Sequence, residues 1–259
     1  MSKNFSDLKT FKGYLKRPDG STIAYQKTAG MSPGVLFLGG FRSDMNGTKV
    51  LSVEEFCKKR GQAVVRFDYF GHGDSSGRFE DGTIGRWTKD ALAVIDEVTE
   101  GPQILIGSSM GGWIMILAAL ARLNRIVGLL GIAAAPDFTE DLINAALTAE
   151  QTASIGMRGY CTISTPYDEE PYLITKKLID DGKQNLLLGK KIDLDMPIRL
   201  IHGMNDNDVP WETAHNIMDS IEGEDVEVQF IKGGDHRLSS AADLNRLSWT
   251  LEALLRFVE

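Results

Sequence analysis

The sequence predicts an α/β protein with a doubly wound, mostly parallel sheet and a small helical cap insertion. Three observations support this fold class: short apolar runs recur along the chain, amphipathic segments of helical length separate them, and one stretch, residues 136–191, breaks the alternation. Apolar runs without a polar face are typical of strands that a parallel sheet buries on both sides. Their alternation with helices predicts right-handed crossovers and helices on both faces of an open sheet.

The first two expected strands form a hairpin, residues 11–17 and 22–28, around the turn signal Arg17-Pro18-Asp19-Gly20. Buried strands follow, and the apolar runs place them at residues 35–38, 63–67, 103–106, 127–133, 198–201 and 226–231. Helical periodicity places the helices at residues 48–60, 83–99, 111–123, 212–221 and 239–257.

The stretch that breaks the alternation contains no convincing buried strand, only helix-like segments at residues 140–148 and 171–181. It is too long for a simple connection between two strands. We therefore predict an α/β core of residues 1–135 and 192–259, with residues 136–191 as a cap or lid over the carboxyl ends of the strands. A plain structural excursion is the alternative.

Composition excludes several classes of protein. The 259 residues include 28 Lys and Arg against 36 Asp and Glu, so the formal net charge is −8, and no cluster of basic residues suits a nucleic acid or an anionic lipid surface. Cys57 and Cys161 are too few for a disulfide framework and lack the spacing of a zinc site. No apolar stretch has the length of a membrane helix, so stable membrane insertion is not expected.

Ser109 is the candidate nucleophile. It stands in Gly107-Ser108-Ser109-Met110-Gly111, a G-x-S-x-G motif with a predicted strand before it and a predicted helix after it. The tight turn needs residues without a Cβ two positions either side of the serine. Phosphate-binding loops share this Gly/Ser-rich context, but neither GxxxxGK[ST] nor GxGxxG is present at the turn.

A nucleophilic serine needs a base, and the chain has four histidines. His236 lies directly after the last predicted strand, where the base is expected. His202, at the end of a strand, has the position of a core histidine bonded to backbone, and His215 lies in a polar part of a helix. His72, in a loop after a strand, is either a residue that lines the site or a turn residue.

The acid that orients the base is expected after the penultimate strand. Asp206 lies three residues beyond Gly203, which ends that strand, and Asp208 is the rival, with a role as a helix cap as its simpler interpretation. With Asp206 as the acid, the chain order is Ser109, Asp206, His236. That order is expected of an α/β-hydrolase.

The loop after the first central strand, Gly39-Gly40-Phe41, is the expected source of a second oxyanion donor. We predict an oxyanion hole made by the amides of Phe41 and Met110, with a tight turn as the alternative. Trp113, Trp211 and His72 are candidate substrate contacts. Apolar side chains of the cap form either an acyl pocket or the core of the cap itself, namely Phe138, Leu142, Ile155, Met157 and Tyr160.

Several blocks in register resemble the α/β-hydrolase family of abhydrolase domain-containing protein ten, from about residue 25 to the C-terminus. They are Gly39 to Lys49, Arg66 to Tyr69, Gly71 to Gly77, Gly101 to Trp113, His202 to Met204, Val209 to Trp211 and Asp235 to Arg237. The resemblance implies a serine hydrolase of acyl esters and thioesters, with protein depalmitoylation and acyl-glucuronide cleavage as the family's activities. It also puts Ser109, Asp206 and His236 at the triad positions.

The chain departs from the family pattern in two ways. Gly39 stands where the wider superfamily usually has His, and the N-terminus lacks the features of a targeting sequence, which is expected of a bacterial, cytoplasmic protein.

The predicted function is a serine hydrolase that forms an acyl-enzyme and needs no metal or cofactor. Its expected partner is a small acyl ester or thioester, or an acylated protein; the oligomeric state stays open. A serine aminopeptidase or a lactonase on the same triad is the nearest alternative, and a non-catalytic ligand-binding protein is the alternative from another class.

Overall fold

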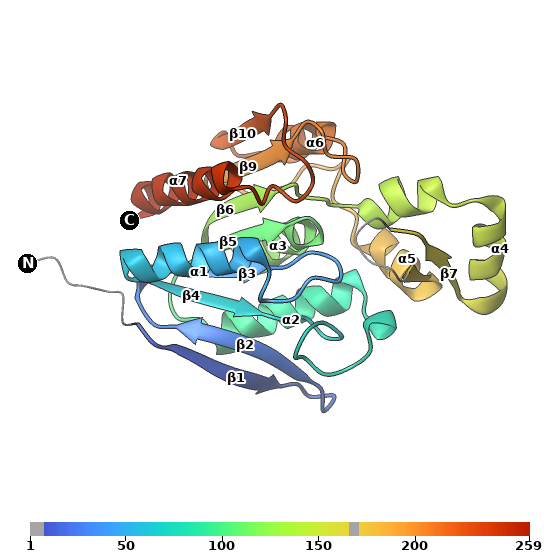
Figure 1. Cartoon of the computed structure of the whole chain (residues 1–259), viewed down its shortest axis with the longest axis horizontal. Coiled ribbons are helices and arrows are strands. Elements are labelled where there is room, and N and C mark those ends of the chain that lie inside the picture. The colour runs from blue at the N-terminus through green and yellow to red at the C-terminus, as the bar shows by residue number, and fades with distance from the viewer. Residues whose placement is uncertain (1–7, 166–170) are drawn as a thin grey trace, which may run out of the picture.

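The computed structural model describes residues 8–165 and 171–259, and its centre is one eight-stranded sheet (Figure 1). The strands are β1 (Thr10–Lys16), β2 (Thr22–Thr28), β3 (Met31–Leu38), β4 (Gln62–Phe67), β5 (Gln103–Ser108), β6 (Ile126–Ile132), β9 (Ile198–Gly203) and β10 (Val226–Ile231). Their order across the sheet is β1-β2-β4-β3-β5-β6-β9-β10. β2 runs antiparallel to both of its neighbours, and the other pairs are parallel. The predicted fold class is confirmed.

Helices cover both faces of the sheet, as the alternation predicted. They are α1 (Thr48–Arg60), α2 (Ile84–Glu97), α3 (Met110–Ala121), α6 (Glu212–Ser220) and α7 (Ala241–Val258). Side chains of β5 show the division, because Ile104 and Ile106 pack with α1 and α7, whereas Leu105 packs with α2 and α3. Both apolar layers are buried, and residues alternate between them along each central strand. Within the described ranges, no helix is long and apolar enough to cross a bilayer.

The chain leaves the sheet after β6 and returns at β9, and the helices and strands described between them lie beyond the carboxyl ends of the sheet strands (Figure 1). This cap segment contains the π-helix η2 (Thr139–Asn144), α4 (Ala149–Arg158), β7 (Tyr160–Ile163), β8 (Tyr172–Thr175) and α5 (Lys176–Gln184). β7 and β8 pair antiparallel as a separate two-stranded sheet.

The sequence interpretation of the cap segment was wrong in detail. Strands were not expected there, yet β8 occupies the start of the helix predicted at residues 171–181, and α4 was missed. The two strands are only four residues long and partly exposed, so they lack the continuous apolar run by which a buried strand is recognised. The two strands form because they pair with each other, and a local sequence pattern does not predict such pairing.

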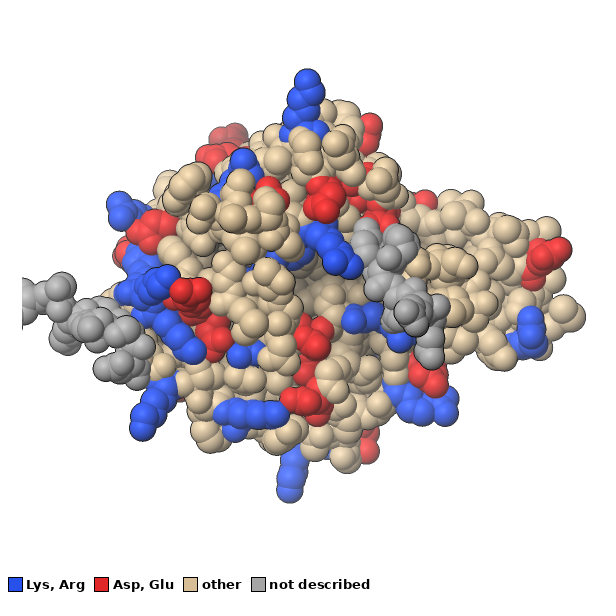
Figure 2. Space-filling model, viewed as in Figure 1, with Lys and Arg blue, Asp and Glu red and all other residues tan. Residues whose placement is uncertain are grey.

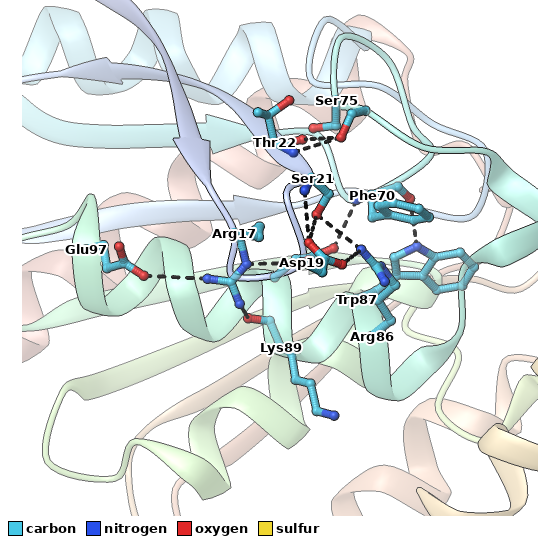
Figure 3. A network of polar contacts seen from close by, with 12 residues as sticks. Arg17, Asp19, Ser21, Thr22, Phe70, Ser75, Arg86, Trp87, Lys89 and Glu97 are labelled. Atoms are coloured by element: carbon cyan, nitrogen blue, oxygen red, sulfur yellow. Dashed lines mark hydrogen bonds and ion pairs between the residues drawn. The ribbon is translucent and has the colours of Figure 1, made fainter.

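A polar network joins the β1–β2 turn to α2 and to the loop after β4 (Figure 3). Arg17 donates to the carbonyl of Lys89 at 3.3 Å, and Arg86 pairs with Asp19 at 2.5 Å. Trp87 Nε1 donates to the carbonyl of Phe70 at 3.0 Å. The network fixes the loop that contains His72 against α2.

Candidate active site

Ser109 lies at a strained turn between β5 and α3. Its φ is 54° and its ψ is −121°, a conformation that non-glycine residues rarely adopt. A Cβ on Gly107 would lie 2.5 Å from the carbonyl oxygen of Gly111, and one on Gly111 would lie 2.1 Å from that of Leu38. Both glycines of the G-x-S-x-G motif are therefore required by close backbone contacts.

The structure brings the three predicted triad residues together from loops after three different strands. His236 Nε2 lies 3.1 Å from Ser109 Oγ, and His236 Nδ1 lies 2.8 Å from Asp206 Oδ2. With the proton on Nδ1, the ring donates to the carboxylate and its Nε2 accepts from the serine hydroxyl. The His236 side chain is 17% exposed and Ser109 is half-buried, so neither residue is sealed in the interior.

Asp206 is the carboxylate that contacts His236, and its rival Asp208 instead donates its amide to Asp206. The Asp206 side chain is fully buried, and its Oδ1 accepts the backbone N–H groups of Asp208 and Val209, each at 2.9 Å. Burial alone would raise the pKa of the Asp206 carboxyl, but contacts from His202, His236 and the Val209 amide hold it below its ordinary value. The carboxylate is therefore charged at neutral pH.

The loop after β3 lies directly against the turn that carries Ser109. A Cβ on Gly40 would lie 3.4 Å from Ser109 Cβ, which places the start of this loop beside the nucleophile. Among residues 8–165 and 171–259, neither the Phe41 amide nor the Met110 amide donates to a protein acceptor. Two N–H groups are thus available on the loops that flank Ser109, as an oxyanion site requires.

Sequence reasoning missed the residues that hold the far end of this loop. Arg66 Nη1 donates to the carbonyl of Met45 at 2.6 Å, and Asp68 Oδ1 accepts the Met45 amide at 2.7 Å. Both side chains are buried at the end of β4 and beyond it. Both residues lie in the block from Arg66 to Tyr69 that resembles the family, but the resemblance of that block assigns no role to either side chain.

Lys49 was also missed as a residue of the site. It lies in the first turn of α1, and its Nζ donates to the carbonyl of Arg237, the residue after His236. Burial lowers the pKa of Lys49 to about 8, against the attraction of Asp235 and Asp206. Lys49 thereby ties α1 to the loop that carries His236.

The structure corrects two of the three predicted substrate contacts. His72 is 4% exposed and packs edge-on against Tyr69, Phe79 and Trp87, and its burial lowers its pKa to about 4. Trp113 is fully buried and donates its Nε1 to the carbonyl of Asn185 at 3.0 Å. Both side chains belong to the packed interior.

The third predicted contact, Trp211, is half-buried at the start of α6. Its ring packs edge-to-face against Phe230 of β10, with the centroids 5.2 Å apart. Two of the candidate cap residues face solvent, since Met157 is 80% and Tyr160 is 39% exposed. They are therefore neither the wall of a buried pocket nor the core of the cap, unlike the buried Ile155.

Four rings connect the site to the cap, and we call them the aromatic bridge: Phe41, Phe79, Phe138 and Tyr172. The Phe41 ring meets the other three edge-on, at centroid distances of 4.8 Å to Phe79, 5.6 Å to Phe138 and 5.8 Å to Tyr172. The Arg42 guanidinium lies 5.3 Å from the Phe79 ring centroid and 5.4 Å from that of Tyr172. The backbone that offers a candidate oxyanion amide is therefore packed against the cap through its own side chain.

Asp206, Asp208 and His236 place ligand-type atoms within 4.8 Å of one another, the spacing of a metal site. The geometry does not fit a metal ion, because Asp206 Oδ2 and His236 Nδ1 bond to each other and Oδ1 already accepts two amides. Asp206 and His236 are therefore already bonded to each other, as a proton-transfer pair requires, and not placed to coordinate an ion.

Comparison with known proteins agrees with this geometry. Residues 35–166 match the family described as serine aminopeptidase, S33. The mitochondrial palmitoyl-protein thioesterase ABHD10 of Pongo abelii is 44% identical over 248 residues, which are 95% of this chain and 81% of that protein.

Two solved structures are similar over nearly the whole chain. Alpha/beta hydrolase domain-containing protein 10 from mouse has a TM-score of 0.89 at 40% identity and covers 96% of this chain and 100% of its own. A putative hydrolase from Agrobacterium vitis S4 has a TM-score of 0.91 at 36% identity and covers 97% of this chain and 99% of its own. The chain therefore belongs to the ABHD10 family of serine hydrolases, which have the α/β-hydrolase fold.

Proposed function

We propose that this protein hydrolyses acyl thioesters and acyl esters through an acyl-enzyme on Ser109, with the S-acyl group of a protein as a natural substrate. The observation that carries the proposal is the continuous chain of contacts from Ser109 Oγ through His236 to the buried carboxylate of Asp206. The relatives named palmitoyl-protein thioesterase support the acyl thioester as the bond that is cleaved.

In the first step, His236 Nε2 takes the proton from Ser109 Oγ as that oxygen attacks the acyl carbonyl carbon. The negative charge that develops on the carbonyl oxygen is stabilised by the amides of Phe41 and Met110. Asp206 keeps the imidazole in the Nδ1–H tautomer and stabilises the imidazolium. His236 then gives the proton to the leaving thiolate or alkoxide, and the acyl group stays on Ser109.

In the second step, His236 takes a proton from water, which attacks the acyl-enzyme. The same two amides stabilise the second tetrahedral intermediate, and the proton returns to Ser109 as the carboxylic acid leaves. Each proton and each acyl transfer is balanced by groups of the chain and one water molecule. The mechanism requires neither a metal ion nor an organic cofactor.

The cap and the aromatic bridge support an apolar acyl group, because the apolar rings of Phe41, Phe138 and Tyr172 meet beside the loop that carries the Phe41 amide. An apolar surface prefers an acyl chain to a charged aminoacyl group. Each methylene group of the acyl chain that it contacts is worth about 1 to 3 kcal/mol of binding free energy. The family match described as serine aminopeptidase favours an amide as the second candidate substrate.

A panel of four substrates tests this order: a palmitoyl thioester, a p-nitrophenyl acyl ester, a lactone and an aminoacyl amide, each scored by kcat/KM. We expect the thioester and the ester to react well above the amide and the lactone. Ser109→Ala is the matched control for every substrate. The highest kcat/KM on the amide would replace the proposal with an aminopeptidase, and the highest on the lactone would replace it with a lactonase.

The substrate and the location are proposed separately. An S-palmitoylated protein and a small palmitoyl thioester carry the same bond, and their relative kcat/KM values distinguish a protein depalmitoylase from a small-molecule thioesterase. The cytoplasmic location expected from the sequence is likewise a proposal, and fractionation of cells that express the tagged protein tests it.

A further inference from the structure

We propose that His202 is a positioning residue for the catalytic acid. Its Nε2–H group holds Asp206 Oδ2, the same oxygen atom that faces His236 Nδ1. The proposal rests on the function proposed above, since it assigns His202 to the same proton-transfer chain. It goes beyond the three residues of a Ser-His-Asp triad, because His202 touches neither the serine nor a substrate.

His202 is placed for this role by the end of β9. Its side chain is 1% exposed, and its Nε2 lies 3.3 Å from Asp206 Oδ2 and 3.1 Å from the carbonyl oxygen of Val209. Both neighbours of Nε2 are oxygen atoms that can only accept, so Nε2 must carry the proton. The core histidine bonded to backbone that the sequence predicted is present, and the same N–H also faces the catalytic carboxylate.

The contact completes the surroundings of the Asp206 carboxylate. Oδ1 accepts the Asp208 and Val209 amides at 2.9 Å each, and Oδ2 lies 2.8 Å from His236 Nδ1 and 3.3 Å from His202 Nε2. Each oxygen therefore has two donors beside it. A carboxylate held in this way cannot rotate without losing a donor, so the direction in which it faces His236 is fixed.

Packing alone does not account for a histidine at this position. In the part of the chain that the structure describes, His202 Nδ1 is buried without a hydrogen-bond partner. A buried polar atom without a partner lowers stability, whereas an apolar side chain of similar size would avoid that loss. The useful atom of the ring is thus Nε2, and its partners are Asp206 and the Val209 carbonyl.

Nε2 is the ring atom with partners, since Nδ1 has no hydrogen-bond partner among the described residues. The other titratable groups close to Asp206 include His236, which shares Oδ2, Asp208, whose carboxylate lies within 4.8 Å, and Lys49, which lies in α1. His202 therefore acts as a fixed donor and His236 as the group that takes and gives protons.

Two variants of His202 separate its N–H from its shape. His202→Leu removes the donor, and His202→Gln restores an amide N–H at about the reach of Nε2. The readout is the second-order rate of labelling by a fluorophosphonate as a function of pH, which needs no knowledge of the natural substrate. We expect about a tenfold loss for the leucine variant, and an acidic limb of its rate profile at higher pH, because a carboxylate with one donor fewer attracts the imidazolium proton more strongly.

The glutamine variant is expected within about threefold of the wild type, with the acidic limb restored. Equal rates and equal pH profiles for the wild type and the leucine variant would overturn the role of His202, and would leave the proposed function intact. A wild-type protein that the reagent does not label at all would overturn the proposed function instead. The two failures are therefore distinguishable.

A measurement on the wild type covers the case in which the leucine variant does not fold. In a protein labelled with ¹⁵N-histidine, the ring nitrogen shifts of His202 are expected to report a proton on Nε2. A proton on Nδ1 with a bare Nε2 would overturn the proposal, because the ring would then offer Asp206 a lone pair.

Discussion

The loops that carry the triad and the cap that lies beside them are held by different kinds of contact. The triad loops are fixed by backbone hydrogen bonds and by a buried carboxylate with donors at both oxygens. The cap meets the core through the rings of the aromatic bridge and through a few polar contacts, such as the Gly85 amide to Asp181 Oδ1 at 2.7 Å. We therefore expect substitutions in the triad loops to affect catalysis more than substitutions in the cap, whose packing tolerates change.

The largest effect is expected at the acid. Asp206→Asn keeps the shape of the side chain but loses the acceptor for His236 Nδ1–H, so kcat is expected to fall by about 10⁴. The matched control is Asp208→Asn, in the same loop, with an expected change of less than about threefold, because its contribution to Asp206 is a backbone amide. Equal losses in the two variants would show that the loop as a whole, and not the carboxylate at 2.8 Å from His236, carries the effect.

Two glycines, one in each region, give the next largest contrast. In Gly111→Ala, the new Cβ would meet the Leu38 carbonyl at 2.1 Å and displace the loop that carries the Phe41 amide, so kcat/KM is expected to fall by about 10² to 10³. Gly156→Ala adds a methyl group in α4 of the cap with no atom within 4 Å, so it is expected to raise the free energy of unfolding by about 0.5 to 1 kcal/mol and leave kcat/KM unchanged. Steady-state kinetics and urea unfolding check both variants; unchanged kcat/KM in Gly111→Ala would contradict the close contact.

Acidic pH tests the core beneath the aromatic bridge. The folded pKa of His72 is lowered to about 4 by burial, so the unfolded chain binds its proton first as the pH falls. The stability that neutral His72 contributes is present above pH 6.5 and is lost as the pH falls toward 4. Against His72→Phe, which has no proton to bind, the wild type is expected to lose about 2 kcal/mol of unfolding free energy between these pH values. A difference between the two proteins that does not change with pH would contradict the buried neutral ring.

The smallest effect is expected in the cap. Tyr172→Ala removes one ring of the aromatic bridge, and an aromatic pair is worth about 0.5 to 1.5 kcal/mol, so kcat/KM for a long acyl chain is expected to fall about twofold to tenfold. The effect on a short acyl ester is expected to be smaller. Tyr172→Phe keeps the ring, and Tyr160→Ala changes an exposed ring of the neighbouring strand; both are expected to match the wild type. Equal losses for long and short acyl chains would show that the bridge supports the catalytic loop and not the fit of the chain.

The same contrast explains how much the sequence predicts. The sheet, its helices and the positions of Ser109, Asp206 and His236 follow from local patterns, because each of these residues stands directly after a strand or in a tight turn with its own glycine signature. The strand β8 was missed because its four residues form a strand by pairing with β7. The contacts of Phe41 with Phe138 and Tyr172 join residues far apart in the chain, and no spacing in the sequence predicts these contacts.

Predictions that rest on the chemical type of a residue were less reliable than predictions that rest on its position directly after a strand or in a tight turn. His72 and Trp113 were candidates by type, and their side chains turn into the core because of the loop and helix faces on which they lie. His202 was interpreted as a core histidine, and its approach to Asp206 depends on how the loop after β9 folds back over the strand. The division of the chain into core and cap units stays a prediction, as do the roles of the triad residues.

The most direct test of the account is mass spectrometry of the intact protein after treatment with a fluorophosphonate. The account predicts one adduct per chain, mapped by peptide sequencing to Ser109, and no adduct in Ser109→Ala, because His236 Nε2 at 3.1 Å activates that hydroxyl alone. His236→Ala is expected to react several orders of magnitude more slowly. An adduct of equal stoichiometry in Ser109→Ala, or a wild-type protein that does not react, would contradict it.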